Sequence, residues 1–194
     1  MSLIAFNWFN TLCVLILCLS LAPLAGAEQR LIFGHILEES TAHHRHLLWA
    51  AEQIQEQLGG RYQLEMFPKG QLGNTDAQVI EGFNKGTVHM AYLSLGHLVN
   101  LYGPLSIGAG PFVFRDFDHW QAFSHSDLYR ELVEGFEKAT GMKVLGLAYY
   151  GQRHVTSHKP LHGLEDLQGL VIRVPNIPTM IKTFRLLGGE HRRG

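Results

Sequence analysis

Two arginines in the last third of the chain, Arg153 and Arg173, are the residues whose type and spacing best suggest chemistry. Each lies at or near a predicted strand. An arginine beside apolar strand residues is costly to desolvate, so it usually has an anionic partner. A guanidinium group stays charged and presents paired donors in one plane, which matches a carboxylate. The pattern therefore favours an anion-binding role for Arg173.

Structural alternatives are open for the same region. Glu165 and Asp166 lie shortly before Arg173 and could pair with it, as many arginines near acidic residues do. Asn176 follows Pro175 and could simply cap the next helix. The residues alone do not decide between these roles and ligand binding.

Three histidines, His43, His44 and His46, crowd the predicted start of the first helix. His43 and His46 share a helix face at i, i+3 spacing, which could hold a metal ion. Because no Asp, Glu or Cys lies at a companion spacing, a solvated helix start is the more usual explanation. A periplasmic metal-binding protein that uses these histidines is the alternative function, and the main interpretation includes no metal and no cofactor.

Catalytic motifs give no support for an enzyme. The sequence has no Gly-x-Ser-x-Gly elbow, no HExxH, no phosphate loop and no paired-glycine dinucleotide fingerprint. The net charge of −1 gives no electrostatic argument for binding nucleic acid. We therefore expect a binding protein rather than an enzyme.

The N-terminus predicts export. Residues 12–21 form an apolar run, and Ala25-Gly26-Ala27 provides a small-x-small cleavage site, so residues 1–27 are expected to be a signal peptide cleaved after Ala27. Both cysteines, Cys13 and Cys18, lie within it. A mature chain without disulfides fits a bacterial periplasmic protein that relies on its core.

Residues 28–150 predict a first α/β lobe with a largely parallel sheet, because strands and helices alternate along it. Ligands bind such folds at the carboxyl ends of the strands. Strands are expected over residues 31–36, 62–66, 88–93 and 143–150. Helices are expected from Ser40 or Thr41 to about Leu58, from Asn74 or Thr75 to Gly86, around Trp120 after a cap at Asp116 or Asp118, and from about Leu128 to Gly141. Residues 105–114 are expected to be buried irregular backbone.

Residues 151–194 predict the start of a second lobe. Strands are expected over 155–160 and 170–174, and a helix over 180–187. A lobe of this size lacks the volume for an adequate core of its own.

Seven short motifs occur in an order and spacing that resembles one protein family. They are Gly60-Arg-Tyr-Gln-Leu-Glu-Met-Phe-Pro68, Gln71-Leu-Gly73, Gly86-Thr-Val-His-Met-Ala91, Pro111-Phe-Val-Phe-Arg-Asp116, Gly151-Gln-Arg153, Glu165-Asp-Leu-Gln-Gly169 and Ile172-Arg-Val-Pro-Asn176. The chain resembles the solute-binding proteins of TRAP (tripartite ATP-independent periplasmic) transporters.

The resemblance implies a periplasmic-binding-protein-like architecture of two α/β lobes, with the first mostly present and the second incomplete. It implies a receptor that closes on a small organic anion and delivers it to membrane subunits driven by an ion gradient. By the motif match, Arg173 grips the ligand carboxylate, Arg153 is a second cationic contact or cleft organiser, and Asn176 is a ligand-contacting position.

The end of the sequence departs from the family pattern. Family members continue with a glycine and a proline-containing strand, which residues 190–194 do not resemble. We therefore expect a truncated form, or a non-functional fragment, that folds poorly or binds weakly by itself. Which organic acid is bound does not follow from the sequence.

Overall fold

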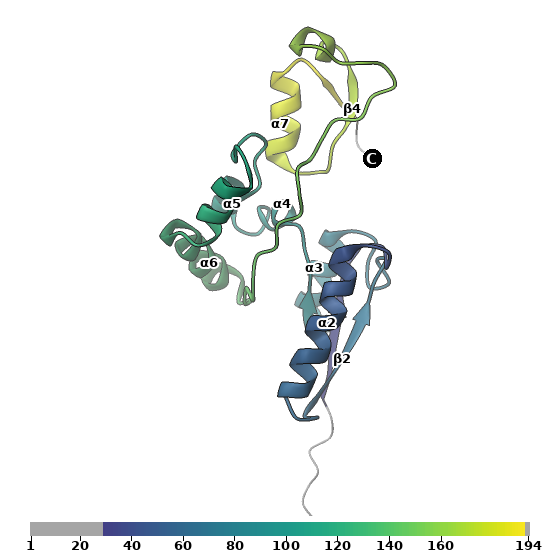
Figure 1. The fold of residues 1–194 in the computed structure, drawn as a ribbon, viewed down its shortest axis with the longest axis vertical. Helices are drawn as coiled ribbons and strands as arrows, with labels where there is room; N and C mark the ends of the chain where they lie inside the picture. The colour runs from purple at the N-terminus through teal and green to yellow at the C-terminus, as the bar shows by residue number, and fades with distance from the viewer. Residues whose placement is uncertain (1–28, 193–194) are drawn as a thin grey trace, which may run out of the picture.

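The computed structural model describes residues 29–192. The predicted signal peptide, residues 1–27, lies outside the described residues. In Figure 1 a sheet-and-helix unit forms one end of the molecule, a group of helices the middle, and a smaller unit with a helix and two short strands the other end. Within residues 29–192, no helix is both long and apolar enough to cross a membrane.

The first unit is a parallel three-stranded sheet in the order β2-β1-β3. β1 spans Gln29–Gly34, β2 Tyr62–Phe67 and β3 Met90–Ala91. The sequence correctly predicted a parallel sheet. It placed the first strand two residues too far along the chain and made the third strand too long.

Side-chain caps fix where the first helices begin. α2 (Ala42–Gln57) and α3 (Asp76–Asn84) follow Thr41 and Thr75, whose hydroxyls accept hydrogen bonds from the backbone N–H groups of His44 and Gln78. Such bonds satisfy donors that have no partner inside the helix. The carboxylate of Asp116 caps α5 (Phe117–Ser124) in the same way. In each case one of the two predicted caps is confirmed.

The helical middle has its own apolar core. It contains α4 (Leu95–Leu98), the 3-10 helix η1 (Gly103–Gly108), α5 and α6 (Asp127–Thr140). Buried side chains from these elements meet in one cluster, formed by Leu105, Phe123, Leu132 and Phe136. α6 ends at Gly141, whose φ of 73° suits a residue without a Cβ. The predicted irregular stretch 105–114 thus begins inside a 3-10 helix.

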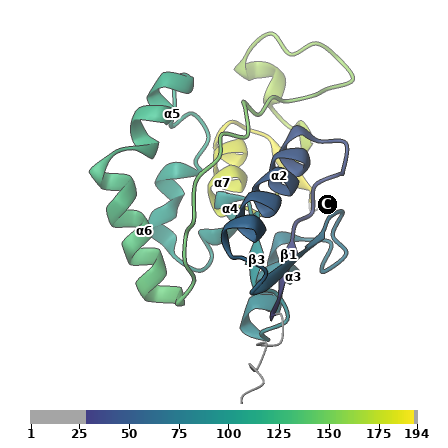
Figure 2. The same cartoon turned by 60° about the horizontal axis from the view of Figure 1, so that its bottom comes forward.

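The third unit is a strand–helix–strand arrangement. The 3-10 helix η2 (Leu164–Leu167) precedes β4 (Val171–Arg173), α7 (Pro178–Leu186) and β5 (Glu190–Arg192). β4 and β5 pair in parallel, with Val171 opposite Glu190. Residues 190–192 therefore form a strand, which the sequence analysis did not predict. Figure 2 shows α7 beside α4.

Two predicted strands are wrong. Residues 143–150 and 155–160 form no strand; they belong to a long connection, residues 142–163, which we call the crossing segment. Figure 1 shows it running from α6 towards the third unit. Leu145 is 79% exposed, so the apolar run is not covered on both faces as expected. An extended segment becomes part of a sheet only when another strand pairs with its backbone, and no strand of residues 29–192 pairs with this one.

Candidate ligand-binding site

Arg173 is the last residue of β4, and its side chain is exposed. No acidic side chain within residues 29–192 lies at ion-pair distance from it. Asp166, one proposed partner, instead accepts hydrogen bonds from the backbone N–H groups of His162 (2.6 Å) and Gly163 (3.2 Å). These two bonds lower the pKa of the Asp166 carboxyl. The structural pairing considered for Arg173 is therefore not observed, and neither is burial beside apolar neighbours.

Asn176 lies just before α7, but it does not cap the helix. The cap position belongs to Ile177, and no side chain there accepts a backbone hydrogen bond. Ile177 is 1% exposed and packs directly on Gly96 of α4. This contact brings the loop that carries Asn176 against the element that carries His97 (Figure 2).

Arg153 belongs to the crossing segment, three residues after Tyr150 and shortly after Gly151, whose φ is 105°. Its side chain is exposed and makes no hydrogen bond or ion pair with the part of the chain that the structure describes.

A cluster that the sequence interpretation missed lies at the carboxyl edge of the first sheet. We call it the edge cluster; its members are His43, Asp76, Tyr92, His97 and Tyr150. They come from the starts of α2 and α3, the residue after β3, α4 and the crossing segment. Long-range folding brings them together, so no local pattern in the sequence indicated them.

Asp76 is the buried charge of the edge cluster, at 2% exposure. Its carboxylate accepts a hydrogen bond from the backbone N–H of Ser94 (2.9 Å) and bonds Nδ1 of His97 (2.8 Å). With the carboxylate as the acceptor, Nδ1 of His97 donates this hydrogen bond. The His97 side chain is 24% exposed, so the ring is partly accessible.

The aromatic members of the edge cluster join three elements. The His43 ring lies 5.0 Å from that of Tyr150, in a stacked geometry, and 5.7 Å from that of Tyr92. Burial, followed by the nearby Tyr150 and Asp76, raises the pKa of Tyr92. Tyr92 therefore stays a neutral hydroxyl at physiological pH, able both to donate and to accept hydrogen bonds.

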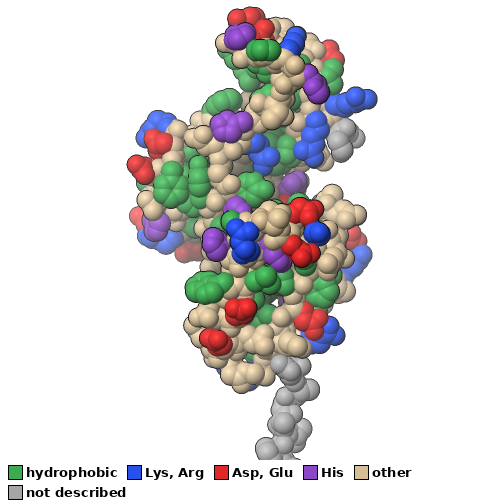
Figure 3. Space-filling view, turned by 45° about the vertical axis from the view of Figure 1, so that its right-hand side comes forward, with side chains coloured by type: hydrophobic (Ala, Val, Ile, Leu, Met, Phe, Trp, Pro, Cys, Tyr) green, Lys and Arg blue, Asp and Glu red, His purple; other side chains and the backbone are tan. Residues whose placement is uncertain are grey.

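The three histidines proposed as a metal site face different neighbours. His44 is buried and its Nδ1 lies 3.0 Å from Nε2 of the buried His35, while His43 stacks on the tyrosines and His46 is exposed. Among residues 29–192, no group of three or more His, Cys, Asp or Glu side chains is placed to hold a metal. Figure 3 shows histidines gathered near the middle of the visible face.

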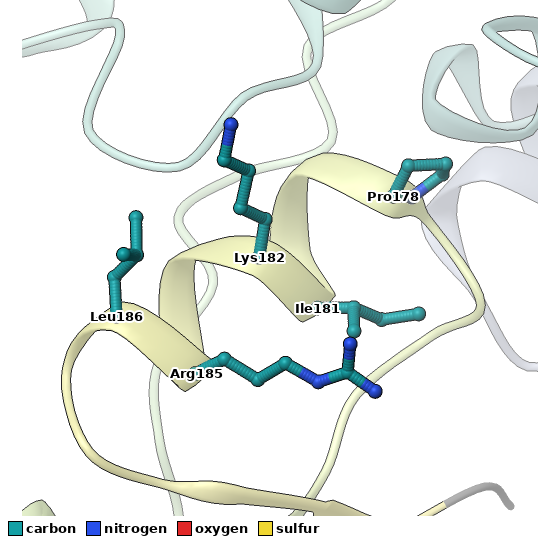
Figure 4. A pocket seen from close by; sticks show the side chains of 5 residues that line it. All are labelled: Pro178, Ile181, Lys182, Arg185 and Leu186. Carbon is teal, nitrogen blue, oxygen red and sulfur yellow. The ribbon is translucent and has the colours of Figure 1, made fainter.

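A surface hollow of about 520 Å³ lies on one face of α7. Pro178, Ile181, Lys182, Arg185 and Leu186 line it, as Figure 4 shows. One helix supplies all of these side chains, so the hollow is open rather than enclosed. None of the three predicted site residues lines it.

Comparison with known proteins resolves the family. Residues 33–193 match the family model of the bacterial extracellular solute-binding proteins, family 7. The chain belongs to this family. Membership supports the expectation of a binding role in transport rather than catalysis.

Several relatives give the same result. The chain is 27% identical over 93% of its length to the sialic acid-binding periplasmic protein SiaP of Vibrio cholerae serotype O1, covering 56% of that protein. It is 31% identical over 84% of its length to the 2,3-diketo-L-gulonate-binding periplasmic protein YiaO of Escherichia coli K12, covering 50% of it. The chain thus spans about half the length of these curated relatives.

The fold agrees with solved structures of the same class. A TRAP periplasmic solute-binding protein from Pseudomonas putida F1, with bound D-glucuronate, matches with a TM-score of 0.80 and 26% identity. The match covers 85% of this chain and 54% of that one. The α/β expectation is confirmed, and the described residues correspond to part of that fold.

Proposed function

We propose that this chain acts as a periplasmic solute-binding receptor of a TRAP transporter and captures a carboxylate-bearing organic anion. Arg173 grips the carboxylate, with Arg153 and Asn176 as further contacts. The receptor then delivers the anion to the membrane subunits of the transporter. Residues 28–150 supply the first lobe and residues 151–194 the start of the second, after removal of residues 1–27 in the periplasm.

The proposal rests on one observation in a protein of this family: Arg173 has no acidic partner among the described residues. Its guanidinium lies at the end of β4, and no carboxylate of residues 29–192 neutralises it. A planar cation with unused paired donors suits a ligand carboxylate better than it suits any described neighbour. Strand β4 also holds the residue in one backbone orientation, which reduces the ordering cost of binding.

The neighbouring loop supports the same assignment. Ile177 holds Asn176 against α4 through its contact with Gly96, so the helical middle and the third unit meet at the loop that follows Arg173. A ligand bound there would touch both units, and its affinity would favour the arrangement in which they are close.

The test compares Arg173→Ala with a control arginine. Isothermal titration calorimetry against a panel of organic acids should show Arg173→Ala weakening binding by at least ~2 kcal/mol, because the ligand carboxylate loses its partner. Arg130→Ala removes an exposed arginine of α6 that pairs with Asp127 and should leave affinity unchanged. An unchanged dissociation constant for Arg173→Ala would count decisively against the proposal.

A further inference from the structure

One side of α7 combines exposed apolar and positively charged side chains. We call it the α7 face; it consists of the residues that line the hollow described above, Pro178, Ile181, Lys182, Arg185 and Leu186. We propose that the α7 face binds the anionic phospholipid surface of a membrane and so holds the protein beside that membrane. The inference goes beyond the proposed function, because it concerns where the receptor resides and not which anion it captures.

Helical spacing places the five residues on one side of α7. They occupy positions i, i+3, i+4, i+7 and i+8, which follow one stripe along a helix. α7 also packs against β5, so the helix is fixed to the third unit while this stripe faces outward. Lys182 and Arg185 are exposed, and Leu186 is 78% exposed. A helix that presents Lys, Arg and Leu together to its surroundings has the composition of one that lies at a membrane interface.

Positive charge is concentrated in the part of the chain that carries α7. Residues 29–150 contain nine Lys or Arg and thirteen Asp or Glu, whereas residues 151–192 contain six Lys or Arg and only three Asp or Glu. Figure 3 shows Lys and Arg side chains gathered beside the grey end of the chain. A charge asymmetry of this kind favours contact between the basic part and an anionic surface.

The cations of this basic part are not used within the protein. Among residues 29–192, every ion pair lies between residues 30 and 143, and none includes a Lys or Arg of residues 151–192. None of the five residues of the α7 face is acidic. Covering Lys182 and Arg185 with apolar protein surface would remove two unpaired charges from water, which is costly. The α7 face therefore suits a partner that supplies negative charge and leaves the cations hydrated.

The shape of the α7 face favours lipid over an acidic protein segment. Stable protein interfaces bury about 800 Å² on each partner and depend on anchors, often aromatic, held in pockets. The α7 face contains no Trp, Tyr or Phe, and a single helix of nine residues supplies it. A fluid lipid surface needs no matching pocket, because Leu186 can enter the headgroup region while the long side chains of Lys182 and Arg185 reach the phosphates.

Vesicle co-sedimentation tests the inference. Since the apolar residues 12–21 would themselves enter a bilayer, the chain without residues 1–27 is used, which is the form expected after export. Binding to vesicles of equal parts phosphatidylglycerol and phosphatidylcholine should be at least about tenfold stronger than binding to phosphatidylcholine alone. The difference should disappear between about 0.05 and 0.5 M salt, because ions screen the attraction. Equal binding to the two vesicle types, or no binding to either, overturns the inference, even if an acidic protein segment binds the α7 face.

Two matched double variants test whether the α7 face is responsible. Each Lys or Arg near an anionic membrane strengthens binding about fivefold, so Lys182→Gln with Arg185→Gln should weaken binding to the anionic vesicles by about tenfold or more. Arg130→Gln with Lys138→Gln removes the same charge from exposed positions of α6 and should weaken it by less than about threefold. Equal losses in the two double variants would show that only net charge matters and would refute the role of the α7 face.

A third variant tests the apolar part of the contact at constant charge. Leu186→Gln removes the apolar side chain and should weaken vesicle binding by about threefold or more. An unchanged partition coefficient contradicts entry of Leu186 into the lipid. All of these substitutions are at exposed positions, and circular dichroism checks that the fold is kept. The comparison of the two vesicle types with the unmodified sequence decides the inference even where a variant does not fold.

Discussion

The contact between Gly96 and Ile177 can be tested by adding one methyl group. A Cβ at Gly96 would lie 3.2 Å from Cγ1 and 3.4 Å from Cγ2 of Ile177, and closer than 3.0 Å to Cδ1. Ile177 is 1% exposed, so it has little free space into which to move. Gly96→Ala should therefore overpack the junction between α4 and the start of α7.

Two opposing effects determine how much Gly96→Ala changes the free energy of unfolding. Overpacking a buried site costs about 1–3 kcal/mol, whereas replacing a helical glycine by alanine gains about 0.5–1 kcal/mol. We expect a net loss of about 1–2 kcal/mol in the unmodified chain. In an Ile177→Val background the closest atom, Cδ1, is absent, so the same change should be neutral or slightly stabilising.

Urea unfolding of the four proteins of this double-mutant cycle provides the assay. Ile177→Val alone should cost about 0.5–1.5 kcal/mol. The cycle should give a coupling free energy of at least ~1 kcal/mol, a value typical of residues in contact. A coupling below ~0.5 kcal/mol, with unchanged unfolding slopes, would show that the two residues do not touch and would refute the proposed junction between the units.

Two further predictions concern pH and the helical core. Burial, reinforced by His44, lowers the pKa of His35, so the stability that His35 contributes is complete above the unfolded value of about 6.5 and is lost as the pH falls through the lower folded value. Thermal melts from pH 7.5 to 5 should show a smaller acid-induced loss of stability for His35→Asn than for the unmodified chain. His46→Asn, at an exposed position, should lose as much stability as the unmodified chain. Phe136→Ala should cost about 3–5 kcal/mol in urea unfolding, because the 2%-exposed ring fills the core of the helical middle. Phe117→Ala, at a 45%-exposed position, should cost far less, and equal losses would contradict the assigned core.

Local chemistry made the helices predictable. Thr41, Thr75 and Asp116 cap helices because their side-chain oxygens reach backbone N–H groups only three residues away. Gly141 ends α6 because it adopts a positive φ at no steric cost. These signals depend on a few neighbouring residues, so the sequence contains them completely.

Strands and the edge cluster depend on distant parts of the chain. Residues 143–150 have the apolar character of a buried strand, yet Leu145 is exposed and no strand of residues 29–192 pairs with them. Conversely, the short polar segment at Glu190 becomes a strand because β4 offers it a partner. The pairing of Asp76 with His97 joins two helices in the same way, and single-sequence patterns do not record such pairing.

The same distinction between local and long-range signals applies to the candidate site. Arg153, Arg173 and Asn176 were selected by motif, and their roles stay predictions, although Arg173 has no acidic partner among the described residues and Asn176 does not cap α7. Tyr92, Tyr150 and His97 were missed because their proximity arises from the meeting of β3, the crossing segment and α4.

The contacts of Tyr149 and Tyr150 in the crossing segment make the fluorescence of Trp120 a natural probe of that segment. The ring of Tyr149 lies 5.0 Å from that of Trp120 in α5, while the ring of Tyr150 stacks on that of His43 in α2. These two successive residues therefore pack the segment against different helices. Indole emission responds to such close neighbours. In the chain without residues 1–27, which contain Trp8, and with the 63%-exposed Trp49 replaced, fluorescence from Trp120 would report when the segment detaches, without an attached dye.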